Sequence, residues 1–386
     1  MRVLHVIPDL NLIRGGPPQA LRALARAQAA TGDDVTVLPC RKSSGPHALE
    51  AGDHGNLHVL PGATHSNLKW ISPSLKRAML TAAEGRDILH VHGTWRYHSR
   101  VSPKVARKTG ARLILRPYGN LGIVSRAHKG RIKSLYWNLF EKGVANAASA
   151  IHCASLKEAR EIQTLGIRSR TFVVPNPVDN TLVDANADNE ALVAACPVLK
   201  SFRHCLLFLG RIVFVKNLTA LVEAFAGIAK DAPDWCLVIG GNPEDTALAE
   251  RLRRMADELG VAERVCLPGM LVGEVKVAAL QRASLFVQPS LHENFGVAAA
   301  EALQFGLPCV ASDGVALADD IEAADAGVRC GTDATSMAAA LLRLMRDSGG
   351  RERMGPNAQA LAERFRPERV AEALRNEYRR CLSPGE

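Results

Sequence analysis

Residues 285–305 read LFVQPSLHENFGVAAAEALQF and contain the pattern that decides the fold. The apolar run at 285–288 predicts a buried strand, and the alanine-rich run at 297–305 predicts a helix. A polar loop with Glu293 and Gly296 joins them. A strand, a short loop and a helix form the repeating unit of a parallel sheet. The stretch therefore predicts an α/β domain whose functional residues follow the strand ends.

The same alternation runs along most of the 386-residue chain. Apolar runs predict further strands at residues 3–7, 34–38, 88–91, 112–115, 151–154, 171–174, 205–209, 236–239, 265–267 and 309–311. This pattern indicates two doubly wound, Rossmann-like domains. We expect an N-terminal domain over residues 1–180, a linker over 181–200, a C-terminal domain over 201–366, and a helix over 367–386 that packs back toward the N-terminal domain.

The composition is that of a globular protein, with 47% apolar and 23% charged residues. These values exclude a disordered or fibrous chain. The apolar runs are too short to cross a bilayer or to form a signal peptide, so we expect a cytoplasmic protein. The nine cysteines form no C-x-x-C pair, and we expect neither a disulfide framework nor a zinc site.

The net charge of +9 is unevenly distributed. Residues 1–180 carry 26 basic against 11 acidic side chains, whereas residues 181–386 carry 22 against 28. A basic half suggests an anionic partner: nucleic acid, an anionic membrane surface or a phosphorylated substrate. Nucleic acid is disfavoured because no recognition module is evident.

Two cations follow the predicted strand at 205–209. Arg211 and Lys216 lie in a loop that ends at Asn217, a residue suited to cap the next helix. A guanidinium, an ammonium and free helix N–H groups together would suit a diphosphate. Two solvated loop cations would give the same pattern.

Two carboxylates flank the helix that follows the strand at 285–288. Glu293 lies in the loop before the helix, and Glu301 lies further along it. Carboxylates beside a phosphate site can accept hydrogen bonds from sugar hydroxyls, which predicts a nucleotide-sugar site. Acidic residues that only complement the helix dipole are the alternative.

Together these motifs resemble those of the retaining glycosyltransferases of family 4, which have the GT-B fold. The matching elements are Gly210-Arg211 with Lys216, the run Glu293-Asn294-Phe295-Gly296, and Glu301 with Gly306-Leu307-Pro308. Residues 175–179, PNPVD, resemble the family's P-N-G-V-D element but carry Pro177 in place of glycine. The resemblance implies two doubly wound domains that face each other across a cleft.

The resemblance also implies roles for individual residues. Arg211 and Lys216 would bind the donor diphosphate, Glu301 would accept from the ribose, and Glu293 would contact the donor sugar. The remaining donor-binding residues would be Asn294, Phe295, Gly296 and Val297 through their backbone, Leu267 beside the base, and Gly15 and Gly16 beside the phosphates. His92, at the end of the strand at 88–91, would face the donor sugar. The catalytic residues would be Arg211, Lys216, Glu293 and His92, with the two cations stabilising the diphosphate as it departs.

The first half also suggests an acceptor. The runs at 92–95, HGTW, and 116–119, RPYG, resemble branches of the family that build exopolysaccharide or capsule. Basic residues between 126 and 133 precede an aromatic-rich segment up to residue 142, a pattern that can lie on an anionic membrane. We therefore expect a glycan or polyprenyl-pyrophosphate-linked acceptor, reached from the inner face of a membrane.

These features predict a retaining glycosyltransferase that moves a hexosyl unit from a UDP- or GDP-linked sugar to a hydroxyl of its acceptor. The sequence has no Asp-x-Asp element, so we expect neither a divalent metal nor another cofactor. Two alternatives share the architecture: a nucleotide-sugar 2-epimerase and a non-catalytic scaffold of GT-B fold.

Overall fold

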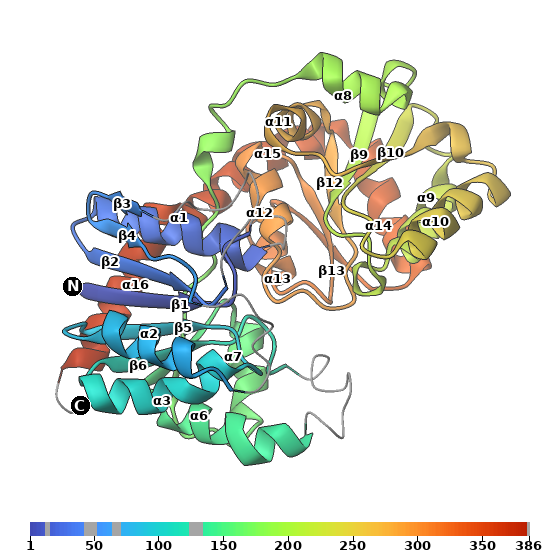
Figure 1. The fold of residues 1–386 in the computed structure, drawn as a ribbon. Coiled ribbons are helices and arrows are strands. Elements are labelled where there is room, and N and C mark those ends of the chain that lie inside the picture. The colour runs from blue at the N-terminus through green and yellow to red at the C-terminus, as the bar shows by residue number, and fades with distance from the viewer. Residues whose placement is uncertain (12–15, 42–51, 64–70, 123–133, 384–386) are drawn as a thin grey trace. The chain divides into compact units, whose positions relative to one another are not determined.

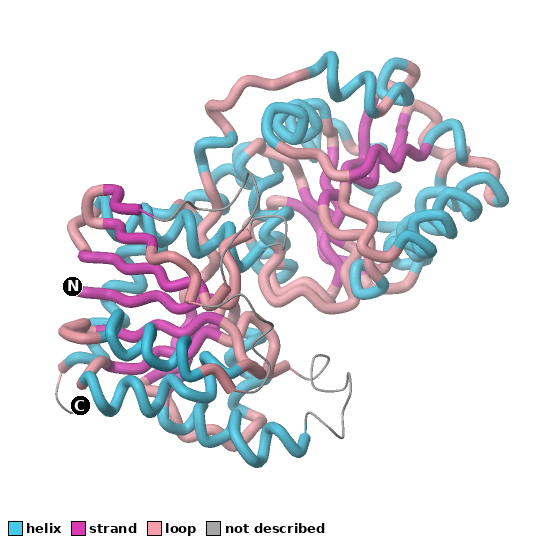
Figure 2. Tube along the Cα trace, in the orientation of Figure 1, coloured by secondary structure: helices cyan, strands magenta, loops and turns pink. Residues whose placement is uncertain are grey.

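The computed structural model describes residues 1–11, 16–41, 52–63, 71–122 and 134–383. The chain forms two compact units, Met1–Pro177 with Pro367–Glu386, and Val178–Arg366. In each unit a mostly parallel sheet carries helices on both faces (Figure 1, Figure 2). The prediction of two doubly wound α/β domains is confirmed.

The first unit contains an eight-stranded sheet of order β3-β4-β2-β1-β5-β6-β7-β8. Its strands are β1 (Arg2–Ile7), β2 (Asp34–Pro39), β3 (Gly52–His54), β4 (Leu57–Val59), β5 (Ile88–His92), β6 (Arg112–Arg116), β7 (Ala150–Cys153) and β8 (Arg170–Val173). Its helices include α1 (Gly16–Ala30), α2 (Pro73–Ala83), α3 (Tyr97–Thr109), the π-helix η2 (Trp137–Glu141), α6 (Lys142–Ala147), α7 (Leu156–Gln163) and α16 (Pro367–Leu382). Only the β3–β4 pair is antiparallel among the described pairs.

Alternating side chains bury the two faces of this sheet against different helices. Val3 and Ile88 pack on the face covered by α1 and α16. Their neighbours Leu4 and Leu89 pack on the opposite face, which α2 and α3 cover. Strands buried on both faces appear in the sequence as continuous apolar runs, and this is why they could be predicted.

The second unit contains a six-stranded parallel sheet of order β11-β10-β9-β12-β13-β14. Its strands are β9 (His204–Leu209), β10 (Trp235–Gly240), β11 (Val265–Gly269), β12 (Leu285–Gln288), β13 (Cys309–Ser312) and β14 (Gly327–Cys330). Its helices include α8 (Asn189–Ala195), α9 (Leu218–Ile228), α10 (Thr246–Glu258), α11 (Gly273–Arg282), α12 (Val297–Gln304), α13 (Ala318–Ala323), α14 (Ala334–Arg346) and α15 (Ser348–Ala362). All the strand ends that precede predicted site residues of this unit lie along one edge, because parallel strands share their direction.

The segment 181–200, expected to be a linker, is folded into the second unit. It contains α8, which packs against α11, and the 3-10 turn Pro197–Lys200. Leu192 and Leu199 are buried. These two apolar side chains anchor the segment to the domain.

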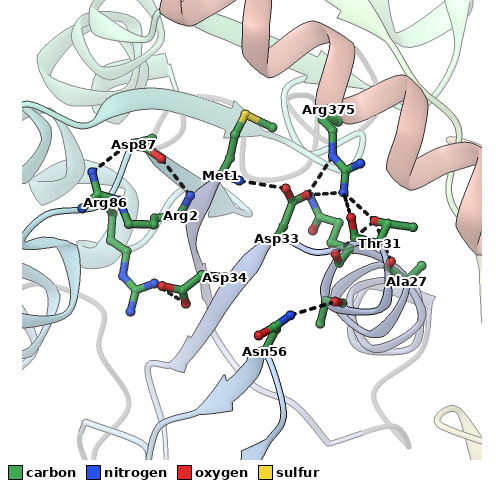
Figure 3. A network of polar contacts seen from close by, with 12 residues as sticks. Met1, Arg2, Ala27, Thr31, Asp33, Asp34, Asn56, Arg86, Asp87 and Arg375 are labelled. Atoms are coloured by element: carbon green, nitrogen blue, oxygen red, sulfur yellow. Dashed lines mark hydrogen bonds and ion pairs between the residues drawn. The ribbon is translucent and has the colours of Figure 1, made fainter.

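The C-terminal helix α16 packs on α1 in the first unit. Its Leu374 and Tyr378 are fully buried in the apolar cluster that contains Val3 and Ile88. Figure 3 shows that Arg375 of this helix also reaches the buried carboxylate of Asp33, with Nη2 and Oδ2 3.1 Å apart. The chain therefore returns to complete the fold of the unit in which it started.

No described helix combines the length and the apolar character needed to cross a bilayer.

Candidate functional site

Lys216 and Glu293 meet at the carboxyl edge of the second sheet. Lys216 ends a short 3-10 turn after β9, and Glu293 lies in the loop after β12. The Lys216 ammonium forms an ion pair with Glu293 Oε2, and the two side chains are only 13% and 23% exposed. A hydrogen bond from Leu291 N to Val215 O, 2.9 Å long, holds the two loops together. The structure thus brings together Lys216, which was predicted to bind the diphosphate, and Glu293, which was predicted to contact the donor sugar.

The loop after β13 fixes the backbone of Glu293. Glu293 N donates to Gly314 O at 2.9 Å, and Ala316 N donates to Glu293 O at 3.0 Å. A Cβ at Gly314 would lie 2.0 Å from Ser290 O, so the close approach of the two loops requires glycine. Ser312 Oγ also donates to Ser290 O at 2.6 Å. Sequence reasoning missed this supporting loop, although it too follows a strand.

Glu301 is paired with a second lysine. Its Oε1 lies 2.7 Å from Lys276 Nζ, and the side chains are 9% and 18% exposed. Lys276 lies within α11 and does not follow a strand, so the search for site residues after strand ends could not predict it. Each predicted carboxylate therefore has a lysine partner in a sheltered place.

No side chain caps the two helices that begin beside these residues. Asn217 was expected to cap α9, but it has a left-handed φ of 57°, and its Nδ2 donates to Thr332 O at 2.7 Å instead. Gly296 precedes Val297, the first residue of α12, with a φ of 108° that favours glycine. The positive ends of both helix dipoles therefore lie at this edge without a capping side chain.

Phe295 contributes its ring to the core rather than to the edge. It is buried and meets Phe365 edge-on, with ring centroids 5.2 Å apart. Only the backbone of Phe295 can serve a ligand, as predicted for it and for Asn294.

Arg211 lies in the same loop as Lys216 but pairs with a different acid. Its Nη1 is 3.0 Å from Glu244 Oε2, and both side chains are more than 40% exposed. Such an exposed pair contributes little free energy, so Arg211 is free to exchange this partner for an anion. Leu267 lies on β11 as predicted, and its carbonyl accepts from Arg253 Nη2 at 3.5 Å.

The predicted glycine loop is described only at its end. Gly15 lies outside the described residues, and Gly16 is the first residue of α1.

His92 lies inside the first unit rather than at its surface. It is fully buried, with Nε2 2.9 Å from His5 Nδ1 and Nδ1 2.9 Å from the Tyr118 hydroxyl. Both ring nitrogens are therefore engaged, and a direct contact with a donor sugar would break one of these bonds. Tyr118 lies two residues after β6 and is partly exposed, and its ring centroid is 5.8 Å from that of His92. The sequence predicted a role for His92 but not for His5, although the two residues lie on neighbouring strands with their side chains on the same face of the sheet.

His5, His90 and His92 are close enough to be considered as metal ligands. Each offers a ring nitrogen, and these atoms lie within 4.8 Å of one another. Burial lowers the pKa of His5 to about 4 and lowers the pKa of His90 and His92 well below the usual value. The buried Arg116 guanidinium contributes to each of these shifts. A divalent cation in this positive, desolvated place would be costly, and we assign no metal to it.

Glu141 is a buried acid beneath the end of β5. Its Oε1 accepts from Trp95 N at 2.8 Å and from Ser99 Oγ at 2.9 Å. Burial raises its pKa to about 7, against the opposing effect of these hydrogen bonds and of Arg100. Glu141 was not predicted, because it lies within the aromatic segment 134–142 and follows no strand.

Two family models match consecutive parts of the chain. Residues 15–177 match the glycosyl transferase 4-like domain, and residues 199–361 match the glycosyl transferases group 1. Each match lies within one of the two folded units.

Curated relatives extend the likeness over most of the chain. A GDP-mannose:cellobiosyl-diphosphopolyprenol alpha-mannosyltransferase of Xanthomonas campestris is 25% identical over 318 residues, which are 81% of this chain and 79% of the relative. A D-inositol 3-phosphate glycosyltransferase of Nocardia farcinica is 30% identical over 63% of this chain and 55% of its own.

Solved structures share the fold. A sucrose-phosphate synthase from Thermosynechococcus elongatus superposes with a TM-score of 0.76 at 21% identity, covering both chains fully. The Anabaena protein HepE, in complex with UDP-glucose, has a TM-score of 0.76 at 17% identity and covers 98% of this chain and all of its own.

Proposed function

Because this chain belongs to family 4 of the GT-B glycosyltransferases, we propose that it transfers a hexosyl unit from a nucleotide-diphosphate sugar to a lipid-linked glycan. The observation that carries the proposal is the pairing of Lys216 with Glu293 beside the uncapped start of α12. This arrangement offers positive charge to a diphosphate and a carboxylate to the sugar that the diphosphate carries.

The donor would exchange partners at this edge. A bound diphosphate would compete with Glu293 for the Lys216 ammonium and with Glu244 for Arg211. Glu293, released from Lys216, could then accept hydrogen bonds from the donor hexose, and Glu301 could accept from the ribose. The charge that develops on the leaving diphosphate is stabilised by preorganised cations and helix N–H groups, which lowers the barrier to its departure.

We propose that transfer proceeds with retention of the anomeric configuration. The acceptor hydroxyl attacks the anomeric carbon from the face that the diphosphate leaves. The bond from the anomeric carbon to the phosphate oxygen breaks, and a phosphate oxygen takes the proton of the hydroxyl. No protein carboxylate is required as nucleophile, and we expect Arg211 and Lys216 to neutralise the leaving group without a divalent metal.

The Xanthomonas relative suggests which substrates to test first. Its name gives GDP-mannose as donor and a cellobiosyl-diphosphopolyprenol as acceptor. We propose the same chemical classes for this chain, within cell-surface polysaccharide synthesis. The basic charge of residues 1–180 suits an acceptor that carries a diphosphate.

The test combines each donor with a short-chain cellobiosyl-diphospholipid. We expect GDP-mannose to yield an α-linked trisaccharide lipid, identified by the one-bond carbon–proton coupling at the new anomeric centre. UDP-glucose serves as the alternative donor, and EDTA should leave the rate unchanged. A product of inverted configuration would refute retention. Conversion of the donor in the absence of acceptor would favour the epimerase, and no turnover with either donor would favour the scaffold.

We also propose that the first unit binds an anionic membrane surface. Leu135 and Leu139 are four residues apart, and each is 62% exposed. The preceding basic residues, 126–133, lie outside the described residues. Cosedimentation with vesicles containing phosphatidylglycerol should fall when both leucines are replaced by aspartate. Replacement of Val183, an exposed apolar residue of the second unit, should have no effect. Equal sedimentation of all three proteins would contradict membrane binding by this segment.

A further inference from the structure

A row of buried histidines crosses one face of the first sheet. His5 of β1, His90 and His92 of β5 and His152 of β7 are all fully buried. They lie on the face that α1 and α16 cover, and they form two hydrogen-bonded chains with side chains of those helices. Neither chain is used by the proposed donor site, so their purpose needs a separate explanation.

The direction of the first chain is fixed by a backbone carbonyl. Val174 O can only accept, so His152 Nε2 must donate to it over 2.8 Å. His152 Nδ1 then accepts from His90 Nε2 at 3.3 Å, and His90 Nδ1 accepts from the Tyr378 hydroxyl at 2.6 Å. The Tyr378 oxygen therefore has only lone pairs left to offer.

The direction of the second chain is fixed by the Gln28 amide. Gln28 Oε1 lies 2.8 Å from His5 Nε2, and an amide oxygen can only accept, so His5 Nε2 donates to it.

The chain then sets the state of Tyr118. With the proton of His5 on Nε2, His5 Nδ1 accepts from His92 Nε2 at 2.9 Å. His92 Nδ1 must then accept from the Tyr118 hydroxyl at 2.9 Å. The Tyr118 proton therefore points toward His92, and this chain of hydrogen bonds does not use the lone pairs of the Tyr118 oxygen. The side chain as a whole is partly exposed.

Tyr118 is held in place in a way that structural packing alone does not require. Its φ of 54° lies in the left-handed region, which is strained for an aromatic residue. The buried Arg116 guanidinium lies 4.7 Å from the centre of its ring. Trp95, which follows the adjacent strand β5, has a φ of 65°. Two strained aromatic residues therefore follow neighbouring strands, at the edge where α/β sheets bind ligands.

We infer that Tyr118 contacts the acceptor through its phenolic oxygen, which accepts a hydrogen bond from one hydroxyl of the acceptor sugar. Gln28, His5 and His92 are positioning residues, because they act through Tyr118 by fixing the direction of its O–H bond. The inference rests on the proposed glycosyl transfer. It assigns the acceptor rather than the donor to Tyr118 because the two predicted cationic ligands of the diphosphate, Arg211 and Lys216, belong to the other unit.

The first test is Tyr118→Phe, which removes the oxygen and keeps the ring on Arg116. We expect kcat/KM for the cellobiosyl-diphospholipid to fall about 3- to 10-fold, the range for one hydrogen bond, while KM for the donor stays constant. Monodeoxy acceptors should identify the hydroxyl. For the wild type, one of them should have a kcat/KM lower than that of the full acceptor by the same factor. For Tyr118→Phe, that deoxy acceptor and the full acceptor should have equal kcat/KM values. Tyr97→Phe is the matched control, since Tyr97 is buried on the opposite face of the same sheet. Unchanged acceptor kinetics in Tyr118→Phe would overturn the inference.

The second test separates positioning from mere stability. Gln28→Leu should lower acceptor kcat/KM, and the double variant with Tyr118→Phe should be no worse than Tyr118→Phe alone, because both act on one oxygen. Losses that multiply would overturn the positioning role. In ¹⁵N spectra, His92 should carry its proton on Nε2, and a proton on Nδ1 would overturn the inference.

Failure of the Tyr118 inference can be distinguished from failure of the proposed function. If the wild type transfers no sugar, that function fails, and octyl cellobioside is then titrated into wild type and Tyr118→Phe by NMR. Weaker binding to the variant would support the contact, whereas equal Kd values would overturn it.

Discussion

Lys216 is the residue on which the proposed chemistry most directly depends, because it is the sheltered cation at the edge of the second sheet. Its ammonium is paired with Glu293 and is only 13% exposed. Charge in such a place interacts more strongly with an anion than charge in water does. A single preorganised donor of this kind is worth a large factor in rate.

Lys216→Ala should therefore lower kcat/KM for the donor by about 100- to 1,000-fold, the effect of removing one preorganised donor from a developing anion. Steady-state kinetics with GDP-mannose and with UDP-glucose measures it. Arg346→Ala is the control, because Arg346 pairs with Asp231 on an exposed surface. A loss below about threefold in Lys216→Ala would contradict the assigned role.

Glu141 gives a prediction about pH. Its pKa is raised from 4.5 to about 7, so the folded protein holds a proton that the unfolded chain releases. The stability due to this group is complete below pH 4.5 and is lost as pH rises through 7. In Glu141→Gln this loss should be absent, a difference of about 3 kcal/mol across the window. Hydrogen exchange of the β5 amides between pH 5 and 8 measures it, and parallel profiles for both proteins would be the contrary result.

The contrast between Lys216 and Tyr118 shows what single residues in a sequence reveal. Lys216 and Glu293 could be predicted because each follows a parallel strand, and parallel strands end at one edge. Lys276 lies inside a helix, and Tyr118 acts through a chain of hydrogen bonds that only the folded sheet assembles. His92 was found by its position, but the hydroxyl that is hydrogen-bonded to it was not.

At the scale of elements, the buried histidines make the first sheet sensitive to acid. Burial lowers the pKa of His5 and of His98 to about 4, below the usual 6.5. The unfolded chain therefore binds protons that the folded chain does not. The stability due to these groups is complete above pH 6.5 and is lost as pH falls toward 4.

His98→Asn should reduce this dependence. His98 Nε2 bonds the carbonyl of His92, and an asparagine keeps an N–H donor without a titrating group. Between pH 6.5 and 4 the unfolding free energy of the wild type should fall more steeply than that of the variant, by up to about 1.4 kcal/mol per pH unit. Urea unfolding at several pH values tests this. Identical slopes would contradict this, because they would show that His98 binds its proton over the same pH range in the folded and the unfolded chain.

Depth of burial explains part of the difference between the elements that were predicted and those that were missed, although β14 was missed with three of its four residues buried. The central strands appear as apolar runs because both of their faces are covered. The hairpin of β3 and β4 has three residues per strand, and β3 is fully exposed, so it carries no such run. Helix α8 was missed because only Leu192 of its side chains is buried.

At the scale of the whole molecule, the chain leaves the first unit near residue 177 and returns to it at residue 367. The first unit therefore cannot complete its core until nearly all of the chain has been made. Helix α16 supplies Leu374 and Tyr378 to the face that contains the histidine chains. The stability of the first unit should thus depend more strongly on the last twenty residues than the stability of the second unit does.

Leu374→Ala tests this dependence. Removing a fully buried leucine side chain should cost about 2–5 kcal/mol, and the loss should be confined to the unit that α16 completes. Hydrogen exchange followed by mass spectrometry should show faster exchange in β1, β5 and β6 and unchanged exchange in β9, β10 and β12. Glu372→Ala, on the exposed side of the same helix, should leave both sheets unchanged. Faster exchange in both sheets of Leu374→Ala would mean that the two units unfold together, and that α16 stabilises the molecule as one cooperative body.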